Sequence, residues 1–247
     1  IGQPLIIIHG FLGMSDNWLS IAKIISESLA LKIIIPDQRN HGLSKHHHVF
    51  NYDALVDDLD ELYDYLNIEH AILLGHSMGG KVAMQFALNH SEKVSSLIIA
   101  DISPISYKSY RHVELIELMY NTDFAQFVNR KQIETYFEKK VNDKRLIWFL
   151  LKNIYEISKN TYAWKLNIES LRLNLEEVFK FDIGNNVFEK ETLFLKGELS
   201  DFIQTEHLQV IKSMFPNYKM QTISNTGHWL HADNQKDFID AVVDFIG

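Results

Sequence analysis

The sequence predicts an α/β fold, in which a parallel sheet is covered by helices on both faces. Short aliphatic runs of strand length alternate with longer amphipathic runs of helical period along most of the chain. The strand-length runs are apolar at consecutive positions, which is typical of strands that are buried on both faces.

The alternation predicts six strands and five helices. The expected strands are Leu5–His9, Leu31–Pro36, Ala71–Leu74, Ser95–Ala100, Thr192–Lys196 and Lys219–Ile223. The expected helices are Trp18–Leu29, Asp53–Leu66, Met78–Asn89, Thr205–Met214 and Gln235–Phe245. Because 247 residues with 46% hydrophobic content are enough for one sizeable core, we expect a single α/β core with an insertion.

The insertion is expected where the alternation stops, between about residue 104 and residue 181. This stretch is helical in period, rich in aromatic residues and without a convincing strand. Residues 103–180 contain 13 basic and 10 acidic residues, whereas the whole chain has a net charge of −8. We therefore expect a helical cap at 104–181 between two core segments, 1–103 and 182–247. A decorative insertion with no role in the site is the alternative.

Composition excludes several classes of protein. The net charge and the absence of a basic run argue against a nucleic-acid partner. The chain has no cysteine, which excludes disulfides, thiolate nucleophiles and cysteine-bound zinc, and which is compatible with the cytoplasmic location that we expect. No aliphatic run approaches the ~20 residues that a membrane span needs. The sequence begins at Ile1 without methionine, so it does not allow us to judge whether the protein is made with a signal peptide.

One serine stands where an expected strand meets an expected helix, in "LLGHSMGG". The G-x-S-x-G pattern in this context is typical of a nucleophile elbow, a tight turn that lifts the serine hydroxyl above the sheet. Gly75, Gly79 and Gly80 allow the strand and the helix to approach closely. Ser77 is the expected nucleophile, and an ordinary glycine-rich turn is the alternative.

A serine nucleophile needs a base, which we expect in "TGHWLHAD" near the C-terminus. In hydrolases with this elbow the histidine lies on a loop after the last strand. His228 fits that position. His231 is the competing base, but it lies toward the next helix and lacks a preceding glycine.

The backbone amides of Phe11 and Met78 are the expected donors for an oxyanion hole. Phe11 follows the first strand in "HGFLG", and Met78 begins the helix after the nucleophile. A plain connection at "HGFLG" is the alternative.

The acid is open between two aspartates. The usual position, three residues after the glycine in "LKGELSDF", is occupied by Ser200, and Asp201 is one residue out of register. Asp101 follows the strand after the nucleophile's helix, and its strand ends on the same edge of the sheet as Ser77. We prefer Asp101, with Ser200 as a hydrogen-bonding accessory, and keep Asp201 as the alternative acid.

The whole chain resembles the α/β-hydrolase superfamily, and more closely the bacterial YbfF-like serine esterases. The segments that carry the resemblance are "HGFLGMSDNW", "PDQRNHGLS", "LLGHSMGGKVAM", "ADISPISY" and "GHWLHAD". The resemblance implies a mostly parallel twisted sheet flanked by helices, with an inserted helical cap. It also implies that Asp101 is the triad acid and that Ser200 occupies the usual acid site.

We therefore expect a serine hydrolase that acts on carboxylic esters of small to medium acyl groups through an acyl-enzyme intermediate. A small-molecule ester or thioester is the expected partner, and neither an organic cofactor nor a metal is expected. Basic cap residues favour an acyl-CoA thioesterase as one alternative: Lys108, Arg111 and Arg130. A carbon–carbon bond hydrolase of the same fold and a non-enzymatic ligand receptor are the others. The oligomeric state is not determined by the sequence.

Overall fold

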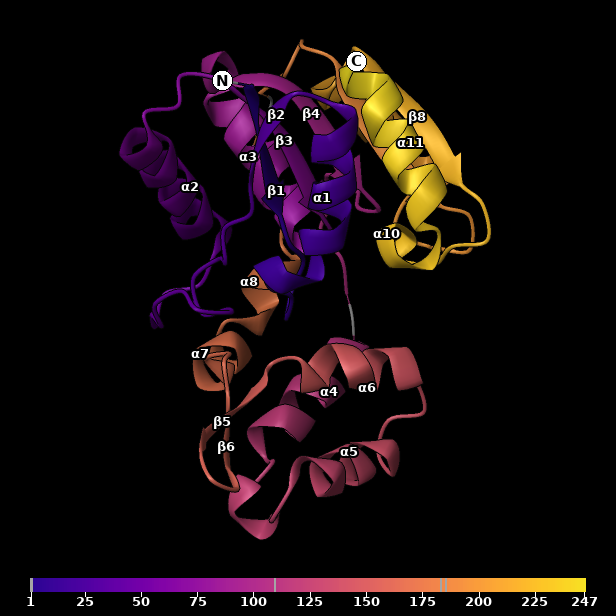
Figure 1. Ribbon diagram of the computed structural model, residues 1–247. Coiled ribbons are helices and arrows are strands. Elements are labelled where there is room, and N and C mark those ends of the chain that lie inside the picture. Colours follow the sequence, from indigo (N-terminus) through magenta and orange to yellow (C-terminus); the bar gives the residue numbers. More distant parts are fainter. Residues whose placement is uncertain (1, 109, 183, 185) are drawn as a thin grey trace.

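The central sheet is parallel, as the sequence predicts (Figure 1). The computed structural model describes residues 2–108, 110–182, 184 and 186–247, with the side chains of these residues except those of 110 and 111. Within them, six parallel strands lie in the order β2-β1-β3-β4-β7-β8. Their bounds are β1 Gln3–Ile8, β2 Leu31–Ile34, β3 Ala71–His76, β4 Val94–Ala100, β7 Thr192–Gly197 and β8 Tyr218–Ile223.

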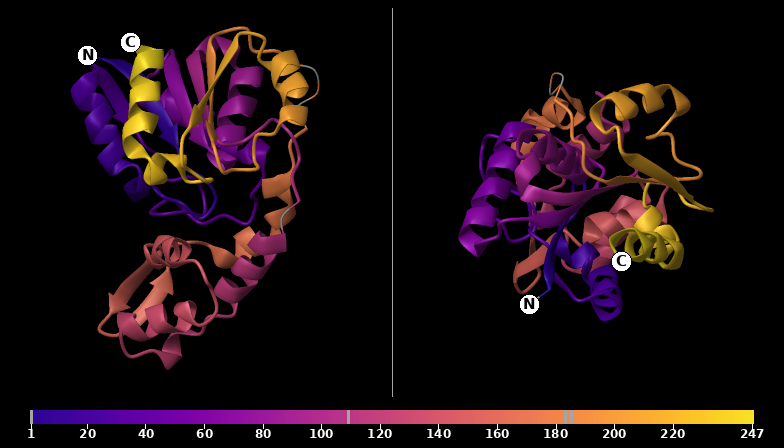
Figure 2. Two further views of the ribbon diagram at one scale, coloured as in Figure 1. Left: turned by 90° about the vertical axis from the view of Figure 1, so that its right-hand side faces the viewer. Right: turned by 90° about the horizontal axis from the view of Figure 1, so that it is seen from above.

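Helices cover both faces of this sheet, as Figure 2 shows. The first face is covered by α1 (Leu19–Ser28) and α11 (Gln235–Ile246). The second face is covered by three helices: α2 Tyr52–Leu66, α3 Met78–Asn89 and α9 Leu208–Met214. Successive side chains of β1 alternate between these faces: Leu5 packs in the hydrophobic cluster on the first face and Ile6 in the cluster on the second. Burial of both faces explains the consecutive apolar residues of the strands.

Helix α3 lies in the middle of the molecule, and its residues from Met78 to Leu88 are all buried. It packs against β3, β4 and β1 on one side and against α2 on the other. A mostly apolar helix is expected at such a position. The helix that begins directly after Ser77 is therefore fixed on all sides.

The segment between β4 and β7 contains the cap, which lies below the carboxyl edge of the sheet in Figure 1. Its helices are α4 Tyr110–Tyr120, α5 Arg130–Glu138, α6 Lys144–Leu151, α7 Ile168–Leu173 and α8 Leu175–Phe179. The cap also contains an antiparallel hairpin of β5 (Ile154–Ser158) and β6 (Thr161–Trp164), which the sequence analysis did not predict. Its turn uses Asn160 in the left-handed region, at φ 61°, which asparagine tolerates well.

The remaining elements are short. They are η1 Ser15–Asn17, η2 Ser91–Lys93, η3 Phe124–Gln126, η4 Thr205–His207 and α10 Leu230–Asp233. None of the helices in the described part of the chain combines the length and the hydropathy that a membrane crossing requires.

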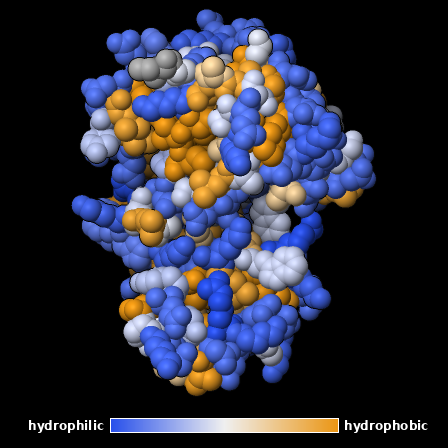
Figure 3. All heavy atoms as spheres, viewed as in Figure 1, coloured by the Kyte–Doolittle hydropathy of each residue, from blue (hydrophilic) through white to orange (hydrophobic). Residues whose placement is uncertain are grey.

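Figure 3 shows hydrophobic residues gathered on the core between α2 and α1, over the edge strand β2. Ile33, Ile34 and Ile35 are half-buried there.

Candidate active site

Ser77 occupies a strained turn between β3 and α3. Its backbone has φ 53° and ψ −120°, a conformation that costs free energy for a residue with a Cβ and persists only when the surroundings enforce it. Two glycines allow this. A Cβ on Gly79 would lie 2.2 Å from the carbonyl oxygen of Ile8, and one on Gly75 would lie 2.3 Å from that of Gly79. The close approach of β1, β3 and α3 places the Ser77 hydroxyl at the carboxyl edge of the sheet.

The hydroxyl of Ser77 meets the imidazole of His228, which lies on the loop after β8. Ser77 Oγ and His228 Nε2 are 2.9 Å apart, and His228 Nδ1 is 2.8 Å from Asp101 Oδ2. A carboxylate only accepts hydrogen bonds, so Nδ1 carries a proton and donates a hydrogen bond to Asp101. Nε2 is then free to accept the hydrogen bond from the Ser77 hydroxyl. The three residues form one continuous hydrogen-bonded chain.

Asp101 is fixed from several directions. Its side chain is fully buried, and its backbone is in the left-handed region at φ 54°. Oδ1 accepts a hydrogen bond from the backbone N–H of Gly197 at 2.9 Å, and Oδ2 also accepts one from the hydroxyl of Ser200. Each of these donors stabilises the ionised carboxylate. The structure thus brings Ser200 onto the same carboxylate that holds His228.

The two competing residues lie elsewhere. The side chain of Asp201 is exposed, on the rim of the cavity beside Phe202, whereas Nδ1 of His228 faces Asp101. The His231 ring is buried and stacks on Trp18 with 4.3 Å between ring centroids. Burial lowers the pKa of His231 to about 3, so this ring is neutral.

The loop after β1 passes directly beside the nucleophile. A Cβ on Gly10 would lie 3.2 Å from the Cβ of Ser77, and the next residue, Phe11, lines the same cavity as Ser77 and Met78. The loop is held at Leu12, whose φ is 60°. Its N–H donates to His41 Nε2 at 3.1 Å, and its carbonyl accepts from Asn153 Nδ2 of the cap at 2.9 Å. Phe11 and Met78 therefore line the cavity into which Ser77 opens.

Two residues that support His228 were not identified by the sequence analysis. His76 Nε2 donates to the backbone carbonyl of His228 at 2.8 Å. Burial and the nearby His231 hold the pKa of His76 well below its usual range, so its ring is neutral. The ring of Phe202 stacks on that of His228 at 3.9 Å. The position of His76, immediately before Ser77, was the only sequence signal for its role.

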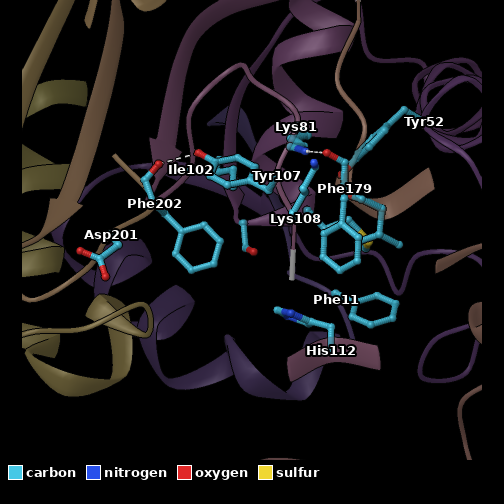
Figure 4. A pocket seen from close by; sticks show the side chains of 13 residues that line it. Phe11, Tyr52, Lys81, Ile102, Tyr107, Lys108, His112, Phe179, Asp201 and Phe202 are labelled. Atoms are coloured by element: carbon cyan, nitrogen blue, oxygen red, sulfur yellow. Dashed lines mark hydrogen bonds between the residues drawn. The ribbon is translucent and has the colours of Figure 1, made fainter. Parts of the chain in front are cut away.

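The nucleophile opens into an inner cavity of about 220 Å³ between the core and the cap (Figure 4). Its lining is mostly apolar and aromatic: Phe11, Tyr52, Ser77, Met78, Lys81, Ile102, Tyr107, Lys108, His112, Val178, Phe179, Asp201 and Phe202. An outer cavity of about 550 Å³ borders His228 and Trp229 on the other side and is also lined by cap residues such as Leu118 and Leu146. A third cavity, of about 80 Å³, borders both Ser77 and His228.

The basic cap residues differ in their relation to these cavities. Lys108 lines the inner cavity. Arg130 donates to the backbone carbonyls of Ile154 and Leu151 within the cap, at 3.1 and 2.6 Å. The side chain of Arg111 is outside the described part of the structure. For the described residues, no group of three or more histidine or acidic side chains is arranged to hold a metal ion.

Comparisons with known proteins show the family of the chain. The model of the alpha/beta hydrolase fold family matches residues 3–235. The sn-1-specific diacylglycerol lipase ABHD11 of Danio rerio is 35% identical over 98% of this chain and 78% of its own length. Esterase YbfF of Escherichia coli strain K12 is 28% identical over 97% of this chain and 91% of its own. A solved marine microorganism esterase is 39% identical, with a TM-score of 0.95 over 99% of this chain and 95% of that one.

Proposed function

Because the chain belongs to the alpha/beta hydrolase fold family and is a carboxylic ester hydrolase, we propose that it cleaves esters of small to medium acyl groups through an acyl-enzyme on Ser77. The observation that carries this proposal is the hydrogen-bonded chain from Asp101 through His228 to Ser77, which ends at the wall of a cavity.

In the first half of the reaction, Ser77 Oγ attacks the ester carbonyl while His228 Nε2 takes the hydroxyl proton. The carbonyl oxygen becomes an oxyanion, which the amides of Phe11 and Met78 stabilise. The bond to the alcohol oxygen then breaks, and His228 Nε2 returns its proton to that oxygen. The products are a free alcohol and an acyl group esterified to Ser77.

In the second half, water attacks the acyl carbon while His228 Nε2 takes its proton. The bond to Ser77 Oγ breaks, the proton goes back to the serine, and the carboxylic acid leaves. Asp101 keeps the proton on His228 Nδ1 throughout, so that Nε2 is the reactive nitrogen, and it stabilises the imidazolium that forms in each half.

The expected size of the acyl group follows from the inner cavity. Its volume of about 220 Å³ fits a short chain, and Phe11, Ile102 and Phe179 offer that chain an apolar wall. An esterase and a diacylglycerol lipase among the relatives support an ester as the substrate. A panel of ethyl esters and ethyl thioesters of graded acyl length defines the preference, with the maximum expected at short to medium esters.

Labelling with a fluorescent fluorophosphonate tests the proposal, because such probes react with activated serines. We expect the wild type to be labelled and to release alcohol from esters, and Ser77→Ala to do neither while keeping its melting temperature. Ser103→Ala is the matched control, since this serine is also buried near the site but donates to the Phe202 carbonyl. Labelling that survives in Ser77→Ala contradicts the proposal.

A further inference from the structure

The inner cavity contains a buried lysine that the reaction described above does not use. Lys81 lies on α3, four residues after Ser77, and is 2% exposed. Its ammonium group donates to the backbone carbonyls of Phe179 and Lys180 at 2.9 and 3.0 Å. An ammonium has three donors, and these carbonyls take two of them.

The surroundings of Lys81 contain no counter-charge. Within the described residues, no carboxylate lies within ion-pair distance of its Nζ. The rings of Tyr52, Tyr107 and Phe181 lie around it, with centroids 5.6, 5.0 and 5.9 Å from Nζ. A buried charge without a counter-ion is unfavourable, and an anion that enters the cavity lowers this penalty.

The charges that line the cavity are distributed unevenly. Figure 4 shows Lys81 and Lys108 at one end and Asp201 at the other, beyond Phe202. Two cationic side chains thus face the same part of the cavity, and Asp201, the one acidic side chain among the described residues of its lining, lies away from them. This end of the cavity is suited to a negatively charged group.

The position of His228 decides which part of the substrate occupies the inner cavity. His228 delivers a proton to the leaving alcohol, so the alcohol lies on its side, where the outer cavity borders His228 and Trp229. The inner cavity borders Ser77, Phe11 and Met78 but does not border His228. A smaller cavity of about 80 Å³ borders both Ser77 and His228 and has less room for an acyl chain than the inner cavity of about 220 Å³. The acyl chain therefore extends into the inner cavity, toward Lys81.

We propose that the substrates are half-esters of short dicarboxylic acids, whose acyl chain ends in a free carboxylate, and that Lys81 is the specificity-determining residue that binds this carboxylate. Lys108 adds a second positive charge at the same end of the cavity. The inference rests on the proposed function, because it assigns the acyl group for that same site. Hydrolysis of such a half-ester releases an alcohol and a dicarboxylic acid.

Binding of the carboxylate depends on the charge of Lys81, and therefore on pH. Burial lowers the pKa of Lys81 to about 7, so in the free enzyme its charge is lost as the pH rises through that value. Among the described residues, the other titratable and charged groups that line the cavity are Tyr52 from α2, Tyr107 and Lys108 from the segment after β4, His112 from α4 and, at the far end, Asp201 from the loop after β7. Burial raises the pKa of both tyrosines, so they stay neutral across this range.

The test compares esters with the same leaving group. Ethyl half-esters of succinic, glutaric and adipic acid are paired with ethyl butanoate, pentanoate and hexanoate, and ethanol release gives kcat/KM for each. For at least one chain length we expect the half-ester to exceed its neutral partner by roughly tenfold or more, as a charge-assisted hydrogen bond allows. We expect this ratio to fall as the pH rises through 7, since both members of a pair depend equally on His228.

Lys81→Gln removes the charge while keeping N–H donors for the Phe179 and Lys180 carbonyls, and we expect it to reduce the ratio at least tenfold. Lys159→Gln, in the exposed turn of the cap hairpin, is the matched control and keeps the wild-type ratio. Melting temperatures monitor folding. Should Lys81→Gln not fold, the pH dependence of the wild-type ratio decides.

Each other outcome overturns the inference. It is wrong if the neutral esters are preferred at every chain length, if the ratio is constant between pH 6 and 8.5, or if folded Lys81→Gln keeps the ratio. Labelling of Ser77 without turnover of any half-ester also overturns it and leaves the proposed function intact. Absence of both labelling and turnover rejects the proposed function together with the inference.

Discussion

The carboxyl edge of the sheet and the cap are held in place by different kinds of contact. At the edge, the backbone itself positions the site: the N–H of Ser77 donates to the Ala100 carbonyl at 3.1 Å, and that of Asp101 donates to the Leu195 carbonyl at 2.8 Å. The cap is held to a large extent by individual side chains. Asn153 donates to the Leu12 carbonyl, and Arg145 pairs with Asp233 at 2.6 Å.

The two regions should therefore respond differently to substitution. Backbone hydrogen bonds between strands do not depend on the side chains, so the edge keeps its geometry wherever glycine permits the close approach. A side-chain contact can be removed by a single substitution. We therefore expect changes at the edge to abolish catalysis or folding, and changes at the cap contacts to have small effects.

The largest effect is expected for the acid of the edge. Asp101→Asn leaves the shape of the side chain but removes the charge that fixes the tautomer of His228, and kcat falls by on the order of 10⁴-fold. Asp201→Asn is the matched control. Because Asp201 is exposed on the rim of the cavity, we expect its kcat to change less than about fivefold, roughly the effect of losing an exposed ion pair. Steady-state turnover of ethyl butanoate measures both. Equal losses in the two variants refute the assignment of Asp101.

A substitution of glycine tests whether close approach of the backbone positions the edge. In Gly79→Ala the new Cβ would lie 2.2 Å from the Ile8 carbonyl oxygen, which belongs to a buried strand and has no room to move. We expect the free energy of unfolding to fall by about 3 kcal/mol. In Gly227→Ala the nearest atom is Asp233 Oδ2 at 3.7 Å, an ordinary contact, so stability changes little. Urea unfolding curves compare them, and similar midpoints disprove the expected difference.

Buried histidines at the edge make stability depend on pH. The pKa of His231 is about 3 in the folded protein and 6.5 without burial, so the unfolded chain binds an extra proton between these values. Its contribution to stability is therefore present above pH 6.5 and is lost as the pH falls toward 3. His231→Phe keeps the stack on Trp18 and cannot take up a proton.

Between pH 4 and 6 we expect His231→Phe to reduce the pH slope of the unfolding free energy by about 1.4 kcal/mol per pH unit, which corresponds to one proton. Urea unfolding at a series of pH values gives the slope. His207→Phe serves as the comparison, since His207 is only half-buried. An unchanged slope in His231→Phe shows that this ring does not titrate with a lowered pKa.

The smallest effect is expected at the cap. Arg145→Ala removes the ion pair with Asp233, but the arginine side chain is 63% exposed, so water screens the interaction. We expect the free energy of unfolding to change by less than about 1 kcal/mol. Lys144→Ala, at the neighbouring exposed position, is the control for helix propensity. A loss above 2 kcal/mol from Arg145→Ala contradicts the view that cap contacts are individually weak.

The sequence determined the α/β class and the positions of the sheet strands, because periodicity reports burial of each segment directly. The strand β3 and the helix α3 show this well, since both are mostly apolar and both are buried. The same analysis did not predict the hairpin at Ile154–Trp164. It is short, it lies between helices of strong amphipathic period, and its outer strand positions are exposed.

Local patterns likewise singled out Ser77, whose motif contains the glycines that its turn needs, and His228, which follows the last strand of the sheet. Only the tertiary structure decided which aspartate faces His228, because Asp101 and His228 are 127 residues apart in the sequence. Ser200 and Asp201 are adjacent, so in an extended segment their side chains point to opposite sides, and the sequence alone does not say which side faces the histidine. The sequence likewise did not indicate that Lys81 is buried among aromatic rings. A lysine on a helix is usually solvated, and the rings that surround this one come from three distant segments of the chain.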